Sequence, residues 1–293
     1  MPSLRALLQS GADVPAVVTN PDRPAGRGME LRPSPVNQHA VEAGIEVLQP
    51  AKAREPELEE RLRDLAPDVA VVVTYGSILP GRLLEVPRLG FVNLHFSLLP
   101  EYRGAAPVQR AVMDGATVTG VSVMVLTEGM DEGPVLALRE VEVRPNDTSG
   151  TLGERMADLG GPLLVETLER YVAGELEPRE QDHERATYAP KITPEEARID
   201  WARPQEAIVD HVRGLNPAPG AWSEWGGRRL KVWVARPAEG ALEPGVVEGS
   251  GSLVVGTGSG PLELTDVQLA GKRRMAGADL VRGMRPGDDE RLK

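Results

Sequence analysis

An amide and an imidazole that share one face of a predicted strand are the strongest chemical signal in this sequence. Residues 90–95 read GFVNLH, an apolar run typical of a buried strand. Because alternate side chains of a strand point to the same face, we expect Asn93 and His95 side by side at its carboxyl end, where open α/β sheets place ligands. Together they can polarise a carbonyl group and donate to a developing oxyanion. The pair alone, however, favours the alternative of a polar strand end bonded to a neighbouring loop.

Two loops after predicted strands could complete such a site. Residues 97–106 (SLLPEYRGAA) follow the GFVNLH strand directly, a position in which loops often form sites. Asp131 lies in residues 127–134 (TEGMDEGP), after an expected strand at 120–126, and the neighbouring glycines allow a tight loop. A carboxylate there can orient an imidazole, stabilise its charged form or relay a proton. An ordinary turn aspartate is the alternative interpretation.

Positive charges gather in one long loop and in two short stretches near the end of the sequence. Residues 20–36 (NPDRPAGRGMELRPSPV) follow an expected strand at 14–19 and carry Arg23, Arg27 and Arg32. Arginines spaced along such a loop suit phosphate contact, and a solvated surface is the equally weighted alternative. The later basic residues, which could follow a nucleic-acid backbone or simply face solvent, are Arg228, Arg229, Lys231, Lys272, Arg273 and Arg274.

The elements that must position these residues alternate between short apolar strands and helices. This alternation predicts the α/β class with a parallel sheet in the first part of the chain. The short strands with glycine turns after residue 220 predict a small β-barrel or sandwich. The expected strands of the first part cover residues 14–19, 45–49, 68–74, 90–95 and 120–126, and the expected helices cover 56–65 and 106–114.

Composition excludes several classes of protein. With 33 basic and 44 acidic residues the net charge is −11, so a uniformly basic nucleic-acid coat is excluded. The sequence has no cysteine, which excludes disulfides, thiolate nucleophiles and cysteine zinc sites, and its four histidines argue against a metal site. The longest apolar runs are far shorter than a membrane span, and the first 30 residues show no signal pattern. We therefore expect a cytoplasmic protein with no membrane partner, and nothing demands more than a monomer.

Taken in order, these motifs resemble the methionyl-tRNA formyltransferase family. Residues 91–109 (FVNLHFSLLPEYRGAAPVQ) are similar to the signature of the folate-dependent formyltransferases as a group. The loop at 20–36 and the later motifs are similar to those of the tRNA enzymes within this group. Together the matching segments cover nearly the whole chain. The other matching segments are VVVTYGSILP, TEGMDEGP, NDTSGTL, EEARIDW, NPAPGAW, LKVW and LAGKRRM.

The resemblance implies a two-domain enzyme that acts on a charged tRNA. We expect a Rossmann-like formyltransferase domain with a parallel-rich sheet over 1–174, a linker or extended crossover over 175–192, and an OB-like tRNA-binding domain over 193–293. The implied reaction transfers the formyl group of 10-formyltetrahydrofolate to the α-amino group of methionyl initiator tRNA, for translation initiation. No metal is implied.

The resemblance also implies roles for particular residues. The catalytic Asn, His and Asp of the family fall on Asn93, His95 and Asp131. Its tRNA-contacting insertion falls on the 20–36 loop, where Arg27 is the best candidate beside Arg23 and Arg32. The family's folate-contacting stretch and the later basic residues that we expect to bind tRNA are Ser97, Leu98, Leu99 and Pro100, and Lys272 and Arg273.

The sequence departs from the family pattern at its start. The family begins with a strand and a G-T-P loop ahead of the position of Pro2, whereas residues 1–10 here predict a helix. We expect that the chain is truncated or that its start is assigned too late, and that strands beside the absent one keep unpaired backbone groups. In the 20–36 loop, Met29 and Glu30 stand where the family often has two lysines.

Two other functions stay open. The same chemistry could serve an amino sugar nucleotide or a purine-precursor amine as acceptor, although neither needs an arginine loop or a second domain. A catalytically inactive RNA-binding module is the other alternative, because the first strand is absent.

Overall fold

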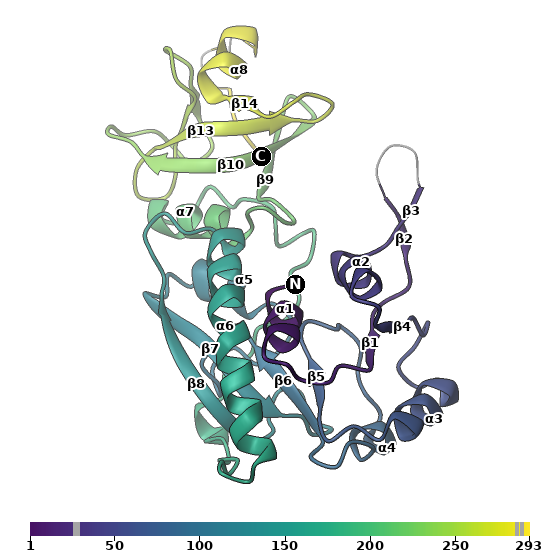
Figure 1. Ribbon diagram of the computed structural model, residues 1–293. Coiled ribbons are helices and arrows are strands. Elements are labelled where there is room, and N and C mark those ends of the chain that lie inside the picture. The colour runs from purple at the N-terminus through teal and green to yellow at the C-terminus, as the bar shows by residue number, and fades with distance from the viewer. Residues whose placement is uncertain (26–29, 285–286, 288–289) are drawn as a thin grey trace. The chain divides into compact units, whose positions relative to one another are not determined.

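The computed structural model describes residues 1–25, 30–284, 287 and 290–293 and divides the chain into two units. The first unit combines Met1–Ala105, Gly120–Val141 and Glu154–Tyr188 (Figure 1). The second combines Ala106–Thr119, Glu142–Gly153 and Ala189–Lys293. The expected boundaries were three consecutive stretches, 1–174, 175–192 and 193–293. The observed units are interleaved along the sequence because short stretches around residues 106–119 and 142–153 pack with the later part of the chain.

The first unit holds the expected α/β alternation. Its elements up to the site strand are α1 (Pro2–Gln9), β1 (Ala16–Val18), β2 (Arg23–Ala25), β3 (Glu30–Arg32), α2 (Pro35–Glu42), β4 (Glu46–Leu48), α3 (Pro56–Leu65), β5 (Ala70–Val72), α4 (Gly81–Leu84) and β6 (Phe91–His95). The later elements, which lie mostly in this unit, are β7 (Val118–Val125), β8 (Val135–Glu142), α6 (Ser149–Val172) and the 3₁₀ helix His183–Arg185.

The strands of this unit form two separate sheets and a hairpin. β1 and β4 make a parallel pair, and four strands make a second sheet in the order β5-β6-β7-β8. β5 and β6 are parallel, so the expected parallel pairing of these two apolar runs is confirmed, whereas β7 is antiparallel to β6. A seven-residue helix, α5 (Pro107–Met113), separates β6 from β7 and spans only roughly 10 Å.

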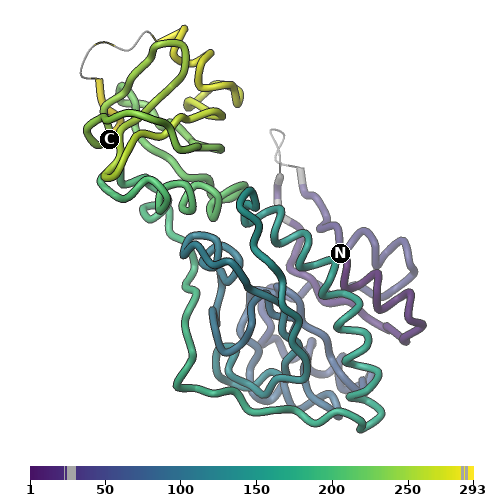
Figure 2. The backbone as a smooth tube through the Cα atoms, turned by 90° about the vertical axis from the view of Figure 1, so that its left-hand side faces the viewer, coloured from purple at the N-terminus to yellow at the C-terminus, as the bar shows by residue number. Residues whose placement is uncertain are grey.

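The helix α1 covers part of the long helix α6. Figure 1 and Figure 2 both show the two helices side by side. The contact is close because Gly161 of α6 has no side chain: a Cβ atom there would lie 3.3 Å from the Cβ atom of Ala6. The helix predicted for residues 1–10 is present as α1 over Pro2–Gln9. Among the described residues, β1 and β5 are each paired on one side only, with β4 and β6 respectively.

The second unit is built on an antiparallel sheet. The strands follow the order β11-β12-β13-β10-β9, with β14 added to β13, and this arrangement agrees with the expected small barrel-like domain. Trp225, Leu230, Val232 and Leu264 are buried at its centre. The elements of this unit besides α5 are α7 (Gln205–Gly214), β9 (Trp222–Trp225), β10 (Arg228–Pro237), β11 (Val247–Glu248), β12 (Val254–Val255), β13 (Leu262–Leu269), β14 (Met275–Ala276) and α8 (Gly277–Met284).

Most of the segment expected as a linker or extended crossover, residues 175–188, runs along the first unit. The backbones of Arg179 and Val135 exchange two hydrogen bonds, of 2.7 and 2.8 Å. Further along, the Arg103 amide donates to the Thr187 carbonyl at 2.9 Å, and the Thr187 amide donates to the Pro100 carbonyl at 3.2 Å. This segment therefore lies against the loop that follows β6. Within the described part of the chain, no helix has both the length and the apolar character that a membrane crossing requires.

Candidate active site

The strand β6 presents Asn93 and His95 on one face. Both side chains are buried, with 8% and 6% of their surface exposed. Leu94 points to the other face, where it packs against α6: a Cβ atom at Gly160 would lie 2.8 Å from a methyl carbon of Leu94. The spacing of two along a strand thus separates the polar pair from the helix-covered face, as the sequence predicts.

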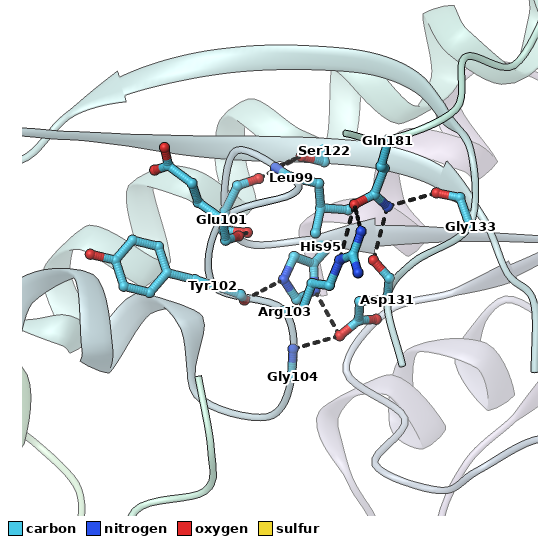
Figure 3. A network of polar contacts seen from close by, with 11 residues as sticks. His95, Leu99, Glu101, Tyr102, Arg103, Gly104, Ser122, Asp131, Gly133 and Gln181 are labelled. Carbon is cyan, nitrogen blue, oxygen red and sulfur yellow. Dashed lines mark hydrogen bonds and ion pairs between the residues drawn. The ribbon is translucent and has the colours of Figure 1, made fainter. Parts of the chain in front are cut away.

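The imidazole of His95 lies between two oxygen atoms. Its Nε2 atom is 3.0 Å from the carbonyl oxygen of Tyr102, and its Nδ1 atom is 3.6 Å from Oδ2 of Asp131 (Figure 3). Each contact is a hydrogen bond or an ion pair only when the nitrogen concerned carries a proton. The arrangement therefore suits a ring that gains positive charge, because both neighbours are then attractive.

Asp131 is held by the loop that follows β6. Its Oδ2 atom accepts a hydrogen bond of 2.8 Å from the backbone amide of Gly104. The residue has a positive φ of 51°, a conformation that few residues other than glycine adopt. Nearby, a Cβ atom at Gly133 would lie 2.0 Å from the carbonyl oxygen of Val125, so only glycine fits there. The glycines of the TEGMDEGP motif thus permit the tight loop that the sequence predicts, and this loop brings the carboxylate to His95.

The loop of residues 97–100 is fixed by hydrogen bonds within the protein. The Ser97 side chain is fully buried, and its hydroxyl donates to the Glu101 carbonyl at 2.6 Å. Ser122 of β7 donates to the Ser97 carbonyl at 2.5 Å and accepts from the Leu99 amide at 3.0 Å. Leu99 is also buried, whereas Leu98 and Pro100 keep part of their surface exposed. A ligand at this loop therefore meets backbone groups, Leu98 and Pro100 rather than the Ser97 hydroxyl.

Sequence reasoning missed three polar residues that surround this site. Ser122 is fully buried, Arg103 is 2% exposed and Gln181 is 7% exposed. Ser122 lies in an apolar strand, where a single serine carries little signal. Arg103 is one arginine in a loop whose signal in the sequence is its position after a strand. Gln181 lies in the polar segment that was expected to be a linker, and no pattern in that segment marks it as buried.

The residues expected to bind tRNA fall in both units. Arg23 and Arg32 are paired across the hairpin of β2 and β3, and Arg32 is exposed. Arg27 lies outside the described residues. Lys272 and Arg273 are exposed in the second unit, between β13 and β14.

The second unit has a basic and aromatic surface that the sequence did not reveal as such. The exposed guanidinium of Arg229 lies over the Trp222 ring, with its carbon 4.0 Å from the ring centre, and that of exposed Arg198 lies at 5.7 Å. The second ring of this surface, Trp233, is approached by Lys231 at 5.2 Å and by Arg274 at 5.3 Å. Such contacts order long cationic side chains at a surface. Among the described residues there is no group of three or more metal-ligating side chains.

Family models match both parts of the chain. A model described as formyl transferase matches residues 3–168, and one described as formyl transferase, C-terminal domain, matches residues 191–285. Solved structures agree on the fold. An N-formyltransferase from Helicobacter canadensis, in complex with folinic acid and dTDP-3-aminofucose, superposes with a TM-score of 0.66 at 16% identity, over 89% of this chain and 93% of that one. HypX from Aquifex aeolicus gives 0.64 at 22%, over 86% of this chain and 45% of that longer chain. The fold and the matched models define a formyl transferase.

Curated relatives identify the family within this class. A methionyl-tRNA formyltransferase from Streptomyces coelicolor is 50% identical over 100% of this chain and 96% of its own length. One from Thermobifida fusca is 48% identical over 100% of this chain and 95% of its own. The chain belongs to the methionyl-tRNA formyltransferase family.

Proposed function

We propose that Asn93, His95 and Asp131 carry the transfer of a formyl group from 10-formyltetrahydrofolate to the α-amino group of methionyl initiator tRNA. The product is N-formylmethionyl-tRNA, which serves translation initiation. The observation that supports this assignment is the convergence of a buried amide, a buried imidazole and a carboxylate at the end of β6. A charged tRNA as acceptor favours the cytoplasm as the location of the enzyme, which we include in the proposal.

The chemistry needs a place for negative charge and a route for one proton. The methionyl amine attacks the formyl carbon, and the carbonyl oxygen gains negative charge. Asn93 donates a hydrogen bond to that oxygen, and the His95 ring stabilises it when both ring nitrogens carry a proton. Asp131 supports the charge on His95 and helps the amine proton move to N10 of the folate as the carbon–N10 bond breaks. A carboxylate 3.6 Å from Nδ1 is close enough for the supporting role.

The folate co-substrate is expected beside the loop of residues 97–100. This loop leaves β6 directly after His95, so a folate there has its reactive end near the catalytic side chains. The internal hydrogen bonds of Ser97 and Ser122 fix the loop before any ligand binds. Fixed backbone groups lose little conformational entropy on binding, which favours affinity. Leu98 and Pro100 supply apolar contacts.

The tRNA requires contacts away from the reacting amine. A methionine esterified to tRNA has no carboxylate beside its amine, so the enzyme must locate the amine by holding the nucleic acid. We assign this role to the arginines of the 20–36 loop, with Arg27 and exposed Arg32, and to the basic and aromatic surface around Trp222. Lys272 and Arg273 add exposed positive charge in the second unit. Phosphate contacts of this kind weaken as salt is added.

A competition among acceptors tests the proposal. The purified protein is given 10-formyltetrahydrofolate and, separately, charged initiator tRNA, a nucleotide-linked amino sugar and a purine-precursor amine. We expect formylation of the tRNA-bound methionine and none of the small amines. Formylation of a small amine in preference to the tRNA would assign a different acceptor, and RNA binding without any transfer would identify an inactive module.

A further inference from the structure

A buried guanidinium and a buried amide form a polar network behind the catalytic side chains. The Arg103 Nε and Nη2 atoms both donate to Oε1 of Gln181, at 3.1 and 2.8 Å. Nε2 of Gln181 donates in turn to the carbonyl oxygens of Asp131 and Gly133, at 2.9 and 2.7 Å (Figure 3). All the hydrogen-bonding positions of the Gln181 amide are therefore used, two as acceptor and two as donor.

This network joins the two loops that hold His95 and Asp131. Arg103 lies between Tyr102, whose carbonyl contacts His95 Nε2, and Gly104, whose amide donates to Asp131. Gln181 donates to the other loop at two backbone carbonyls, those of Asp131 and Gly133. The Gln181 amide thus fixes the loop that carries the Tyr102 carbonyl relative to the loop that carries the Asp131 carboxylate.

We propose that Gln181 is a positioning residue for formyl transfer, which acts with Arg103 to hold Asp131 at working distance from His95. The inference rests on the proposed catalytic roles of His95 and Asp131. Gln181 does not need to touch either substrate. Its part is to hold the loop at Asp131, whose positive φ of 51° is adopted by only a small fraction of non-glycine residues.

The chemistry of the network explains why an amide is required rather than a carboxylate. A glutamate at 181 would attract Arg103 more strongly, but it would place a charged acceptor against the two carbonyl oxygens of residues 131 and 133. The loop would lose both of its hydrogen bonds to the side chain of residue 181, and its carbonyl oxygens would be repelled by the carboxylate. Gln181→Glu therefore keeps the size of the side chain and its bond to Arg103, while it breaks the connection to Asp131.

The test is a double-mutant cycle in formyl transfer. We expect Gln181→Glu to lower kcat by about tenfold or more, with the KM for tRNA and the KM for the folate changed by less than about threefold. Asp131→Asn lowers kcat by itself. In the Asp131→Asn protein, Gln181→Glu should cause less than a further twofold loss, because the carboxylate that it positions is already absent.

Gln205→Glu is the matched control. Its amide donates to a backbone carbonyl, that of Pro261, and both residues belong to the second unit. We expect this variant to keep kcat within about twofold, even if its melting temperature falls. A second variant, Arg103→Lys, keeps the charge but loses the two-pronged contact with Gln181, and it should show the same dependence on Asp131.

Several outcomes would overturn the inference. Wild-type kcat in Gln181→Glu would remove its positioning role. A loss of equal size with and without the Asp131 carboxylate would show that Gln181 acts on general stability rather than through Asp131. Failure of the proposed catalytic role of Asp131 is separate, since Asp131→Asn would then keep full activity whatever Gln181 does.

Discussion

Arg103 and Arg229 carry the same charge in different units, and their surroundings differ. Arg103 is 2% exposed, and its guanidinium is bound to the amide of Gln181. Arg229 is exposed and lies over the face of Trp222, 4.0 Å from the ring centre. A buried cation with a fixed partner can only position other groups, whereas an exposed cation ordered by an aromatic ring remains available to a phosphate. Arg103 thus helps to fix a site inside the first unit, whereas Arg229 is one of the exposed cations to which we assign contact with the tRNA.

This difference predicts which kinetic constant each substitution changes. A buried polar group of the first unit affects the transition state, so its loss lowers kcat. An exposed charge of the second unit affects the binding of the nucleic acid, so its loss raises KM for tRNA and weakens the salt dependence.

The largest effect is expected for Asn93→Ala. In the proposed mechanism this amide donates to the developing oxyanion, and loss of one such donor costs about 2.7–4 kcal/mol of transition-state stabilisation. We expect kcat to fall roughly a hundredfold or more, measured as formylated tRNA at saturating substrates. Asn146→Ala, at an exposed position, is the control and should retain wild-type turnover. Near wild-type kcat in Asn93→Ala would remove this residue from the oxyanion role.

Gly133→Ala tests whether the tight loop is needed. The new methyl group would lie 2.0 Å from the Val125 carbonyl, so the loop must move and carry Asp131 with it. Overpacking of this kind costs about 1–3 kcal/mol. We expect a drop in kcat of roughly tenfold and a lower melting temperature. Gly153→Ala in α6 is the control, because its nearest neighbour lies 4.0 Å from the added carbon and alanine favours helices. Unchanged kcat in Gly133→Ala would contradict the account of the loop.

Arg229→Ala should act on the tRNA rather than on the chemistry. Loss of one phosphate contact is expected to raise the KM for tRNA about three- to tenfold and to reduce the slope of log affinity against log salt by about one. The kcat stays unchanged. Arg63→Ala, which removes an exposed cation paired with Glu59 in α3, is the control for a general charge effect. Equal effects of the two variants would show that the surface around Trp222 has no special part in binding.

The smallest effect concerns a histidine that the mechanism does not use. Burial, together with the nearby charge of Arg203, lowers the pKa of His211 from its usual 6.5. The folded protein therefore disfavours the charged ring, and the free energy of unfolding decreases as the pH falls below 6.5. Above that pH the ring is neutral in both states and the effect vanishes. Thermal melts between pH 7 and pH 5 should show a smaller loss for His211→Gln than for the wild type, and identical losses would contradict this.

Regular periodicity made part of the site predictable. Residues that are two positions apart on a strand share a face by geometry alone, so the sequence was enough to predict that Asn93 and His95 lie side by side. The glycines around Asp131 indicated a tight loop after a strand, and β7 does end just before it. The α/β class followed from the alternation of apolar runs and helical patterns and is confirmed by the fold.

Other features depend on contacts between distant parts of the chain, which no local pattern encodes. Gln181 lies in a polar segment without periodicity, and only its bonds to Arg103 and Asp131 show why it is buried. The interleaving of the two units has the same cause. The hairpin of β2 and β3 was missed because proline and arginine are atypical of strands, and three residues are too few to show alternation.

The central claim is that the Asp131 carboxylate beside His95 supports formyl transfer. Its most direct test is the single-turnover rate of formylation by Asp131→Asn, measured with both substrates bound. The variant keeps the shape of the side chain and an oxygen that can accept from the Gly104 amide, but it loses the charge. We predict a rate about a hundredfold or more below that of the wild type, with both substrates bound as tightly as before. A rate within about threefold of the wild type would contradict the account.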